Sequence, residues 1–209
     1  MGDRIITPDD AEWPRGLRDL RDPPPFLSVR GVLPAGGIAI VGARDADEDA
    51  CAFARALAAR MGRPVISGLA HGIDAAAHRG ALDAGLPTLA YVGTGLARTF
   101  PPEHAELAET IVARGGALAS ERAQPDDAAT EWSLMRRDRL QAAHADAVVL
   151  VVSDVTGGAM HTLRFARELG RPRFALDDAA GGNRAALGDG ALFLPRDVDA
   201  AASRMLAVS

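Results

Sequence analysis

Short apolar runs alternate with longer helical patterns from residue 38 almost to the end of the chain. The apolar runs fall at 38–41, 64–67, 88–92, 117–120, 147–152, 173–176 and 191–194. Patterns typical of helices lie between and after them, at 47–61, 73–84, 104–114, 132–144, 159–169 and 198–206. This alternation is typical of right-handed βαβ units. The sequence therefore predicts an α/β fold with a mostly parallel, doubly wound sheet that has helices on both faces.

The first 31 residues differ from the rest because they are polar and carry a rigid stretch of three prolines at 23–25. We expect residues 1–31 to be a lead-in that packs Trp13, Leu17, Leu20 and Phe26 onto a single main domain at 32–209. The glycines and asparagine at 181–183 predict a loop.

Composition limits the function classes that fit this chain. The net charge is −5, whereas proteins that bind duplex DNA are usually basic, so a nucleic-acid site would need a local patch. All 23 basic residues are arginine. A single cysteine, Cys51, excludes a disulfide framework and a cysteine metal cluster. With no apolar stretch of about 18 residues, we expect a cytoplasmic protein without membrane contact. No metal or cofactor motif is present, and none is expected.

The loops that follow the predicted strands gather glycines. Ligands of such sheets bind outside the carboxyl ends of the strands, where bare backbone amides and helix starts attract phosphate. Turn geometry explains any one glycine, but glycines in four loops at one edge predict an anion or nucleotide site. Its candidate residues are Gly42, Arg44, Ser67, Gly68, Gly72, Gly93, Gly95, Gly157, Gly158 and Thr162.

Arginines form a dense cluster at Arg136, Arg137 and Arg139. Neighbours on a helix lie about 100° apart, so the three cannot share one face. A solvated helical face is the alternative interpretation. We expect these residues and Arg44 to gather on one rim of the sheet and to bind phosphates, although Arg44 precedes an acidic run at 45–49.

Several motifs, taken in order, resemble the DprA/Smf family of DNA-processing proteins. The most specific is the string at 67–78, from Ser67 to His78. The others are at 40–44, 92–96, 100–104, 120–121, 137–139, 157–162, 182–183 and 190–191, so that the resemblance covers about residues 12–195. The chain resembles a compact, diverged member without accessory domains. An aspartate, Asp138, stands where the family has an asparagine between two arginines.

The resemblance implies an extended Rossmann-like domain that is not an enzyme. It implies that the chain binds single-stranded DNA, forms a homodimer and helps to load a RecA-type recombinase in natural transformation. Arg44, Arg137 and Arg139 would hold phosphates, and the glycine loops would supply backbone donors. The wider resemblance leaves an alternative, a nucleotide sensor or a LOG-type nucleotide phosphoribohydrolase. In that enzyme Glu121 would be the catalytic acid and residues 157–158 the phosphate loop.

Overall fold

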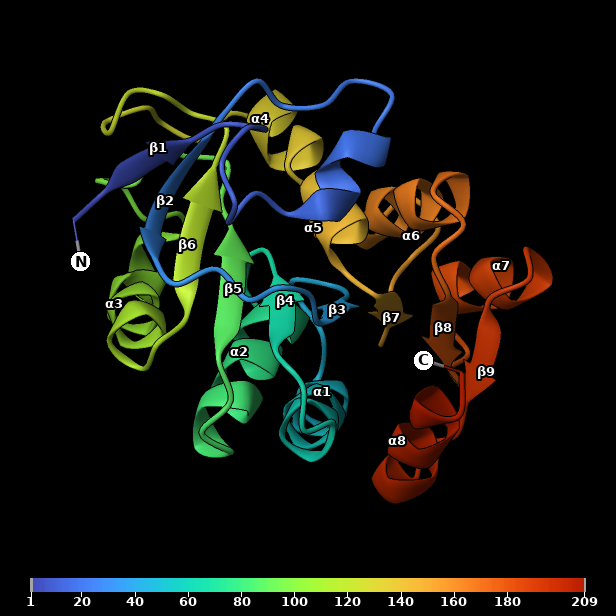
Figure 1. The fold of residues 1–209 in the computed structure, drawn as a ribbon. Coiled ribbons are helices and arrows are strands. Elements are labelled where there is room, and N and C mark those ends of the chain that lie inside the picture. The colour runs from blue at the N-terminus through green and yellow to red at the C-terminus, as the bar shows by residue number, and fades with distance from the viewer. Residues whose placement is uncertain (1, 209) are drawn as a thin grey trace.

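A single sheet runs through the computed structural model, which describes residues 2–208. Residues 1 and 209, the outer ends of the two predicted segments, lie outside the described part. The strand order is β1-β2-β6-β5-β4-β3-β7-β8-β9 (Figure 1). The seven strands from β6 to β9 in this order are parallel, and β1 and β2 extend one edge in antiparallel pairing. The predicted α/β class with a mostly parallel sheet is confirmed.

The strands are short, with three to five residues each. They are β1 (Arg4–Ile6), β2 (Leu27–Gly31), β3 (Ile38–Val41), β4 (Val65–Ser67), β5 (Thr88–Tyr91), β6 (Ala117–Ser120), β7 (Ala147–Leu150), β8 (Arg173–Leu176) and β9 (Leu192–Leu194). The α-helices are α1 (Glu48–Arg60), α2 (Ile73–Asp83), α3 (Ala105–Ala113), α4 (Glu131–Arg136), α5 (Asp138–His144), α6 (Ala159–Glu168), α7 (Gly181–Gly188) and α8 (Val198–Leu206). Two 3₁₀ turns, η1 (Arg15–Asp19) and η2 (Pro102–His104), complete the described elements. None of the helices in this part of the chain has the length and apolar content that a membrane span needs.

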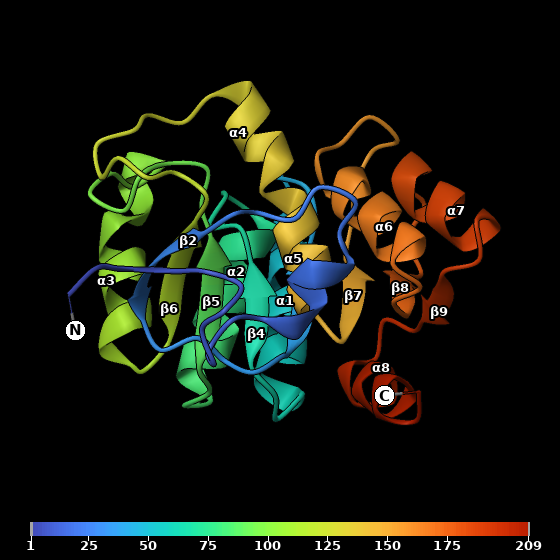
Figure 2. The same cartoon turned by 45° about the horizontal axis from the view of Figure 1, so that its top comes forward.

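Both faces of the sheet are covered. Helices α1, α2, α3 and α8 lie on one face, while α5, α6 and α7 lie on the other with the N-terminal segment (Figures 1 and 2). Side chains of the central strands alternate between the two layers: Ile38 and Ile40 pack on the α1 side, whereas Ala39 and Val41 pack on the α5 side. Burial on both faces explains why these strands are continuously apolar in sequence.

The N-terminal segment contributes strands to the sheet. Trp13, Leu17 and Leu20 are buried, as expected of anchors, and Phe26 is half-buried. In addition, β2 pairs with β6 and β1 pairs with β2, which the sequence reading missed. A signal for β2 was present, because apolar and polar residues alternate from Leu27 to Gly31. The division at residue 31 stays a prediction.

Two helices differ from expectation. The predicted helix at 132–144 is two helices, with Arg137 as the single residue between them. The predicted loop at 181–183 instead begins α7. Tertiary bonds to Asn183 explain this start: its Oδ1 accepts from the Ser153 backbone N at 3.0 Å, and its Nδ2 donates to the carbonyls of Val151 at 2.9 Å and Leu176 at 3.0 Å.

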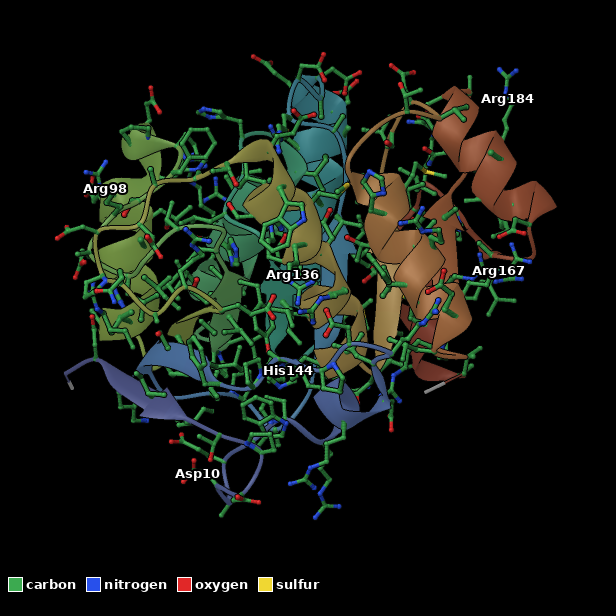
Figure 3. The ribbon with its side chains drawn as sticks, turned by 90° about the horizontal axis from the view of Figure 1, so that it is seen from above. Asp10, Arg98, Arg136, His144, Arg167 and Arg184 are labelled. Atoms are coloured by element: carbon green, nitrogen blue, oxygen red, sulfur yellow. The ribbon has the colours of Figure 1, made fainter. Side chains whose placement is uncertain are left out.

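A buried histidine joins the sheet to the segment before β3. His144 Nε2 lies 2.8 Å from the carbonyl oxygen of Pro34, so this nitrogen carries the proton and donates. Its Nδ1 then accepts from the hydroxyl of Tyr91 at 2.8 Å. Burial lowers the pKa of His144 to about 4, against the opposing effect of the bond to Pro34. The imidazole is therefore neutral at pH 7, and Figure 3 shows it beside the N-terminal segment.

Replacing Tyr91 with phenylalanine tests this arrangement. Tyr91→Phe leaves Nδ1 of His144 buried without a donor, so the free energy of unfolding should fall by about 1–3 kcal/mol in urea titrations. Thr110→Val is the control, because it removes an exposed helix hydroxyl and should change stability by less than about 0.5 kcal/mol. Equal effects of the two changes would contradict the role assigned to the buried pair.

Candidate functional site

The chain reverses its direction of winding between β3 and β7. Strands β4, β5 and β6 continue from β3 toward one edge, whereas β7, β8 and β9 continue toward the other. The segments that leave β3 and β7 therefore diverge and open a crevice above the carboxyl ends of these two strands. A cleft of about 670 Å³ lies there, within the 300–1,000 Å³ common for ligand pockets. Its walls come from the loops after β3 and β7, from α4 and α5, and from the start of α6.

The loop after β3 depends on two glycines. A Cβ on Gly42 would lie 2.5 Å from Cγ1 of Ile73, and one on Gly72 would lie 2.4 Å from the carbonyl oxygen of Ala43. Gly72 also has a φ of +66°, which side chains rarely adopt. Both glycines thus allow the loop to lie against the start of α2. Arg44 follows on the exposed side of this loop and lines the cleft.

The loop after β7 leads into the N-terminus of α6. Gly157 and Gly158 line the cleft, and a Cβ on Gly158 would meet open space. Helix α6 has ten residues and no acidic side chain in its first turn, so the positive end of its dipole is not neutralised by its own residues. Thr162, one turn further, is buried and also lines the cleft. This corner of the cleft suits an anion.

Arg137 is buried in the floor of the cleft. Its side chain lies over Gly68, where a Cβ would be 1.4 Å from Nη1. Nη2 lies 3.7 Å from Oδ2 of Asp74, and Nε lies 3.4 Å from Oδ1 of Asp138. The same Asp74 oxygen accepts from the backbone N of Gly68 at 3.1 Å and of Ala70 at 3.3 Å. Arg137 therefore links α5 to the start of α2 and to the loop after β4.

Arg136 and Arg139 lie elsewhere, on the side of α4 and α5 that faces the N-terminal segment. Arg139 pairs with Glu121, and Arg136 pairs with Asp22 at 2.7 Å and with Glu121 at 3.7 Å. Figure 3 shows Arg136 near the middle of the molecule, seen from above. Burial raises the pKa of Glu121, although the Arg139 guanidinium acts in the opposite direction. None of these side chains lines the cleft.

The structure does not gather the four arginines on one rim of the sheet, as was expected from the sequence. Arg44 lies in the mouth of the cleft, Arg137 lies beneath it, and Arg139 lies on another side of α5. Arg44 alone of these residues forms no salt bridge or side-chain hydrogen bond within residues 2–208. The candidates Gly68 and Gly72 also lie outside the lining, against Arg137 and the loop after β3. Three further candidate residues, Ser67, Gly93 and Gly95, are buried and do not line the cleft.

Those three candidates have local structural contacts. The Ser67 hydroxyl donates to the carbonyl of Ile40 at 2.7 Å. A Cβ on Gly95 would lie 2.0 Å from the carbonyl oxygen of Gln124, and one on Gly93 would lie 3.1 Å from Leu134. The two glycines thus let the segment between β6 and α4 pack closely on the loop after β5.

Acidic side chains outnumber arginines in the cleft. Its lining contains two arginines, Arg44 and Arg137, and five carboxylates, Asp45, Asp74, Glu131, Asp138 and Asp154. Burial and nearby Asp74 raise the pKa of Asp138 to about 7, against the opposing effects of Arg137 and Arg44. Asp138 consequently changes charge near neutral pH.

Sequence reasoning missed Gln141. Its side chain is fully buried, it lines the cleft, and neither amide atom has a hydrogen-bond partner among the described residues. Gln141 follows Asp138 by three positions, and this helical spacing places both on one side of α5. The spacing was visible in the sequence, whereas the missing partners were not.

The fold and the cleft define a Rossmann-like α/β protein with a cleft at the switch point of the sheet. The family of DNA recombination-mediator protein A matches residues 4–201, and the chain belongs to this family. Protein Smf of Escherichia coli strain K12 is 35% identical over 184 residues, which cover 85% of this chain and 49% of that protein. Protein Smf of a Synechocystis species is 32% identical over 187 residues, which cover 84% of this chain and 46% of that protein. The chain thus spans about half the length of these relatives.

Solved structures share this fold. The X-ray structure of DNA processing protein A from Streptococcus pneumoniae superposes with a TM-score of 0.88 at 25% identity, covering 98% of this chain and 73% of that one. The structure of DNA processing protein A from Helicobacter pylori, described for its single-stranded DNA binding mode, superposes with a TM-score of 0.83 at 23% identity. The match covers 98% of this chain and 97% of that one. The molybdenum cofactor carrier protein of Chlamydomonas reinhardtii shares the fold alone, with a TM-score of 0.58 over 81% of this chain and 95% of that one.

Two glycine substitutions test the packing of Arg137. Gly68→Ala places a methyl group inside the buried guanidinium, so the free energy of unfolding should fall by about 1–3 kcal/mol. Gly158→Ala is the matched control, because its Cβ meets open space at a helix start, and it should be neutral or stabilising by up to about 1 kcal/mol. Urea titration measures both, and an unchanged Gly68→Ala would contradict the buried position of Arg137.

The pKa of Asp138 predicts how stability depends on pH. The pKa of Asp138 is about 7 in the folded state, against an ordinary value of 3.8 for an aspartate. The folded state therefore binds the proton more tightly, and stability should fall as pH rises between these values. Asp138→Asn removes this loss. The variant should therefore gain melting temperature over the parent at pH 8 more than at pH 5, by about 2–4 °C for each kcal/mol.

The control for this measurement is Gln124→Met, which changes an exposed side chain outside the cleft and neither adds nor removes an ionisable group. Its melting temperature relative to the parent should be the same at both pH values. An equal effect of Asp138→Asn at pH 5 and pH 8 would contradict the raised pKa.

Proposed function

We propose that this chain binds single-stranded DNA at the mouth of the cleft and acts, without catalysing a reaction, as a recombination mediator that assists a RecA-type recombinase. The observation that carries the proposal is Arg44, an exposed guanidinium with no salt bridge in the described chain, at the same cleft as the N-terminus of α6. Membership of the DNA recombination-mediator family supports the choice of DNA as the ligand.

The geometry suits the backbone of a single strand. Arginine presents a planar, permanently charged fork that binds phosphate oxygens in pairs. The start of α6 offers further donors at the backbone N–H groups of Gly158 and Ala159, since those of Gly157, Met160 and His161 already donate to nearby carbonyls. Open space at Gly158 leaves room for a phosphate. Neither group reads a base, so contacts of this kind bind DNA without regard to sequence.

Affinity should be modest because the rest of the cleft is acidic. The five carboxylates of the lining repel phosphates, and the other arginines of the predicted rim are already paired with carboxylates. The strand therefore has one free arginine to contact in this cleft. Binding through this single arginine should weaken with salt by a slope of about 0.7 in log K against log salt.

The partners named here come from the family and its relatives. The Helicobacter pylori protein is described as binding single-stranded DNA, and the family is described as mediating recombination. These descriptions support single-stranded DNA as the ligand and recombination as the process. We also propose a RecA-type recombinase as partner and a homodimer, because the resemblance of the sequence motifs to the DprA/Smf family implies both.

Glu121 is not proposed as a catalytic acid. It lies outside the lining of the cleft and is paired with Arg139, with Arg136 nearby. A nucleotide in the cleft would not contact it, so we propose no hydrolytic role for this residue.

Fluorescence anisotropy with labelled oligo-dT across a salt series tests the proposal. Arg44→Ala should weaken binding about tenfold, since hydrogen bonds to charged groups contribute on the order of 1.5 kcal/mol or more. It should also reduce the slope of log K against log salt by about 0.7, the value for one phosphate contact on a single strand.

Arg114→Ala is the control. Arg114 is an exposed arginine at the C-terminal end of α3, and therefore at the opposite edge of the sheet from the cleft. Its removal should leave the affinity for oligo-dT and the slope of log K against log salt nearly unchanged. Absence of oligo-dT binding by the parent protein at low salt would overturn the proposal, and equal effects of the two variants would remove Arg44 from the interface.

A further inference from the structure

We infer that the floor of the cleft recognises a guanine base through Gln141 and Asp138, so that the site reads one nucleobase as well as holding phosphate. The inference rests on the proposed function in that it uses the same cleft. The guanine belongs either to a single strand or to a free mononucleotide, and the experiment below separates these two sources.

The first observation is the unsatisfied amide of Gln141. Nε2 and Oε1 are both buried without a hydrogen-bond partner in the described part of the chain. Buried polar groups are nearly always paired, because leaving one unpaired is unfavourable. Since Gln141 lines the cleft, a ligand that enters to the floor can provide the missing partners.

The second observation is the carboxylate of Asp138 beside it. Asp138 is buried, lines the same cleft and accepts no hydrogen bond from residues 2–208. In its ion pair with Arg137, Oδ1 of Asp138 lies 3.4 Å from Nε of Arg137, which is longer than an ordinary hydrogen bond. The charged groups that face it are Arg137 on its own side, Asp74 from α2 and Arg44 from the loop after β3. Its oxygens are thus free to accept hydrogen bonds from a ligand.

These two side chains complement the Watson–Crick edge of guanine. That edge presents two adjacent donors, N1–H and the N2 amino group, followed by one acceptor, O6. An ionised carboxylate accepts from two donors at once, and an amide nitrogen donates to a carbonyl oxygen. In adenine and cytosine a ring nitrogen lone pair would face the carboxylate, and in thymine a carbonyl oxygen would flank the single N–H. Guanine alone offers the two donors side by side.

The rest of the cleft fits a nucleotide with its base inward. Phe100 and Met135 are partly exposed and line the cleft, which gives apolar surface for the faces of a base. Arg44 and the start of α6 remain at the mouth for the phosphate. The acidic lining, which opposes a bare polyanion, supplies acceptors for the N–H groups of a base.

The test compares four 15-residue oligonucleotides, each oligo-dT with a different central base. The parent protein should bind the strand with a central guanine about tenfold tighter than the other three, the size expected of one well-placed pair of base contacts. Gln141→Met keeps the length of the side chain but removes the amide, and should reduce this preference, taken as the ratio of the affinities for the guanine strand and the all-thymine strand in the same variant, to less than twofold. Asp138→Asn should do the same through a different atom, so the inference does not depend on the folding of one variant.

Gln124→Met is the matched control, since it makes the same change at an exposed glutamine outside the cleft and should preserve the preference. A second arm measures the melting temperature with guanosine monophosphate and with the three other mononucleotides. Binding of all four oligonucleotides within twofold would overturn the inference and leave the DNA proposal intact. Stabilisation by guanosine monophosphate alone, lost in Gln141→Met, with no oligonucleotide binding, would support the inference and overturn the DNA proposal. No effect in either arm would overturn both.

Discussion

A buried guanidinium joins the parts of the molecule that form the cleft. Arginine stays charged in proteins even when buried, so Arg137 requires carboxylates around it, and Asp74 and Asp138 supply them. Asp74 in turn accepts from backbone amides of the loop after β4. The same few atoms thus fix the start of α2, the break between α4 and α5, and the distance between them. Gly68 is required because nothing larger than hydrogen fits beside the guanidinium.

This arrangement also determines what the cleft can hold. Carboxylates brought in to satisfy Arg137 make the floor acidic, so phosphates are confined to the mouth, where Arg44 and the N-terminus of α6 lie. The floor keeps hydrogen-bonding groups that are suited to a neutral, polar ligand group. A site of this kind divides its contacts between charge at the rim and shape and hydrogen bonding inside, which is how phosphate contacts position a nucleic acid while base contacts specify it.

Much of the fold could be predicted from sequence because both sides of the central strands are buried, and continuous apolar runs result. The bounds of β3, β6 and β8 agree with the predicted ranges residue for residue. Helix α7 could not be found locally, since its glycine-rich start is held by Asn183 against other strands. For the arginines, helical spacing showed only that Arg136, Arg137 and Arg139 do not share one face. The expectation that Arg137 and Arg139 lie on one rim was wrong, because their positions depend on Asp74 and Glu121, which are distant in sequence.

Asn183 does not line the cleft, but it restrains a loop that does. Its side chain fixes the backbone of Ser153, 30 residues earlier, at the start of the loop that ends in Gly157 and Gly158. That loop is glycine-rich and would otherwise have many conformations. Because α7 holds its first residue in place, the loop is preorganised, and a bound phosphate loses less conformational entropy in ordering it.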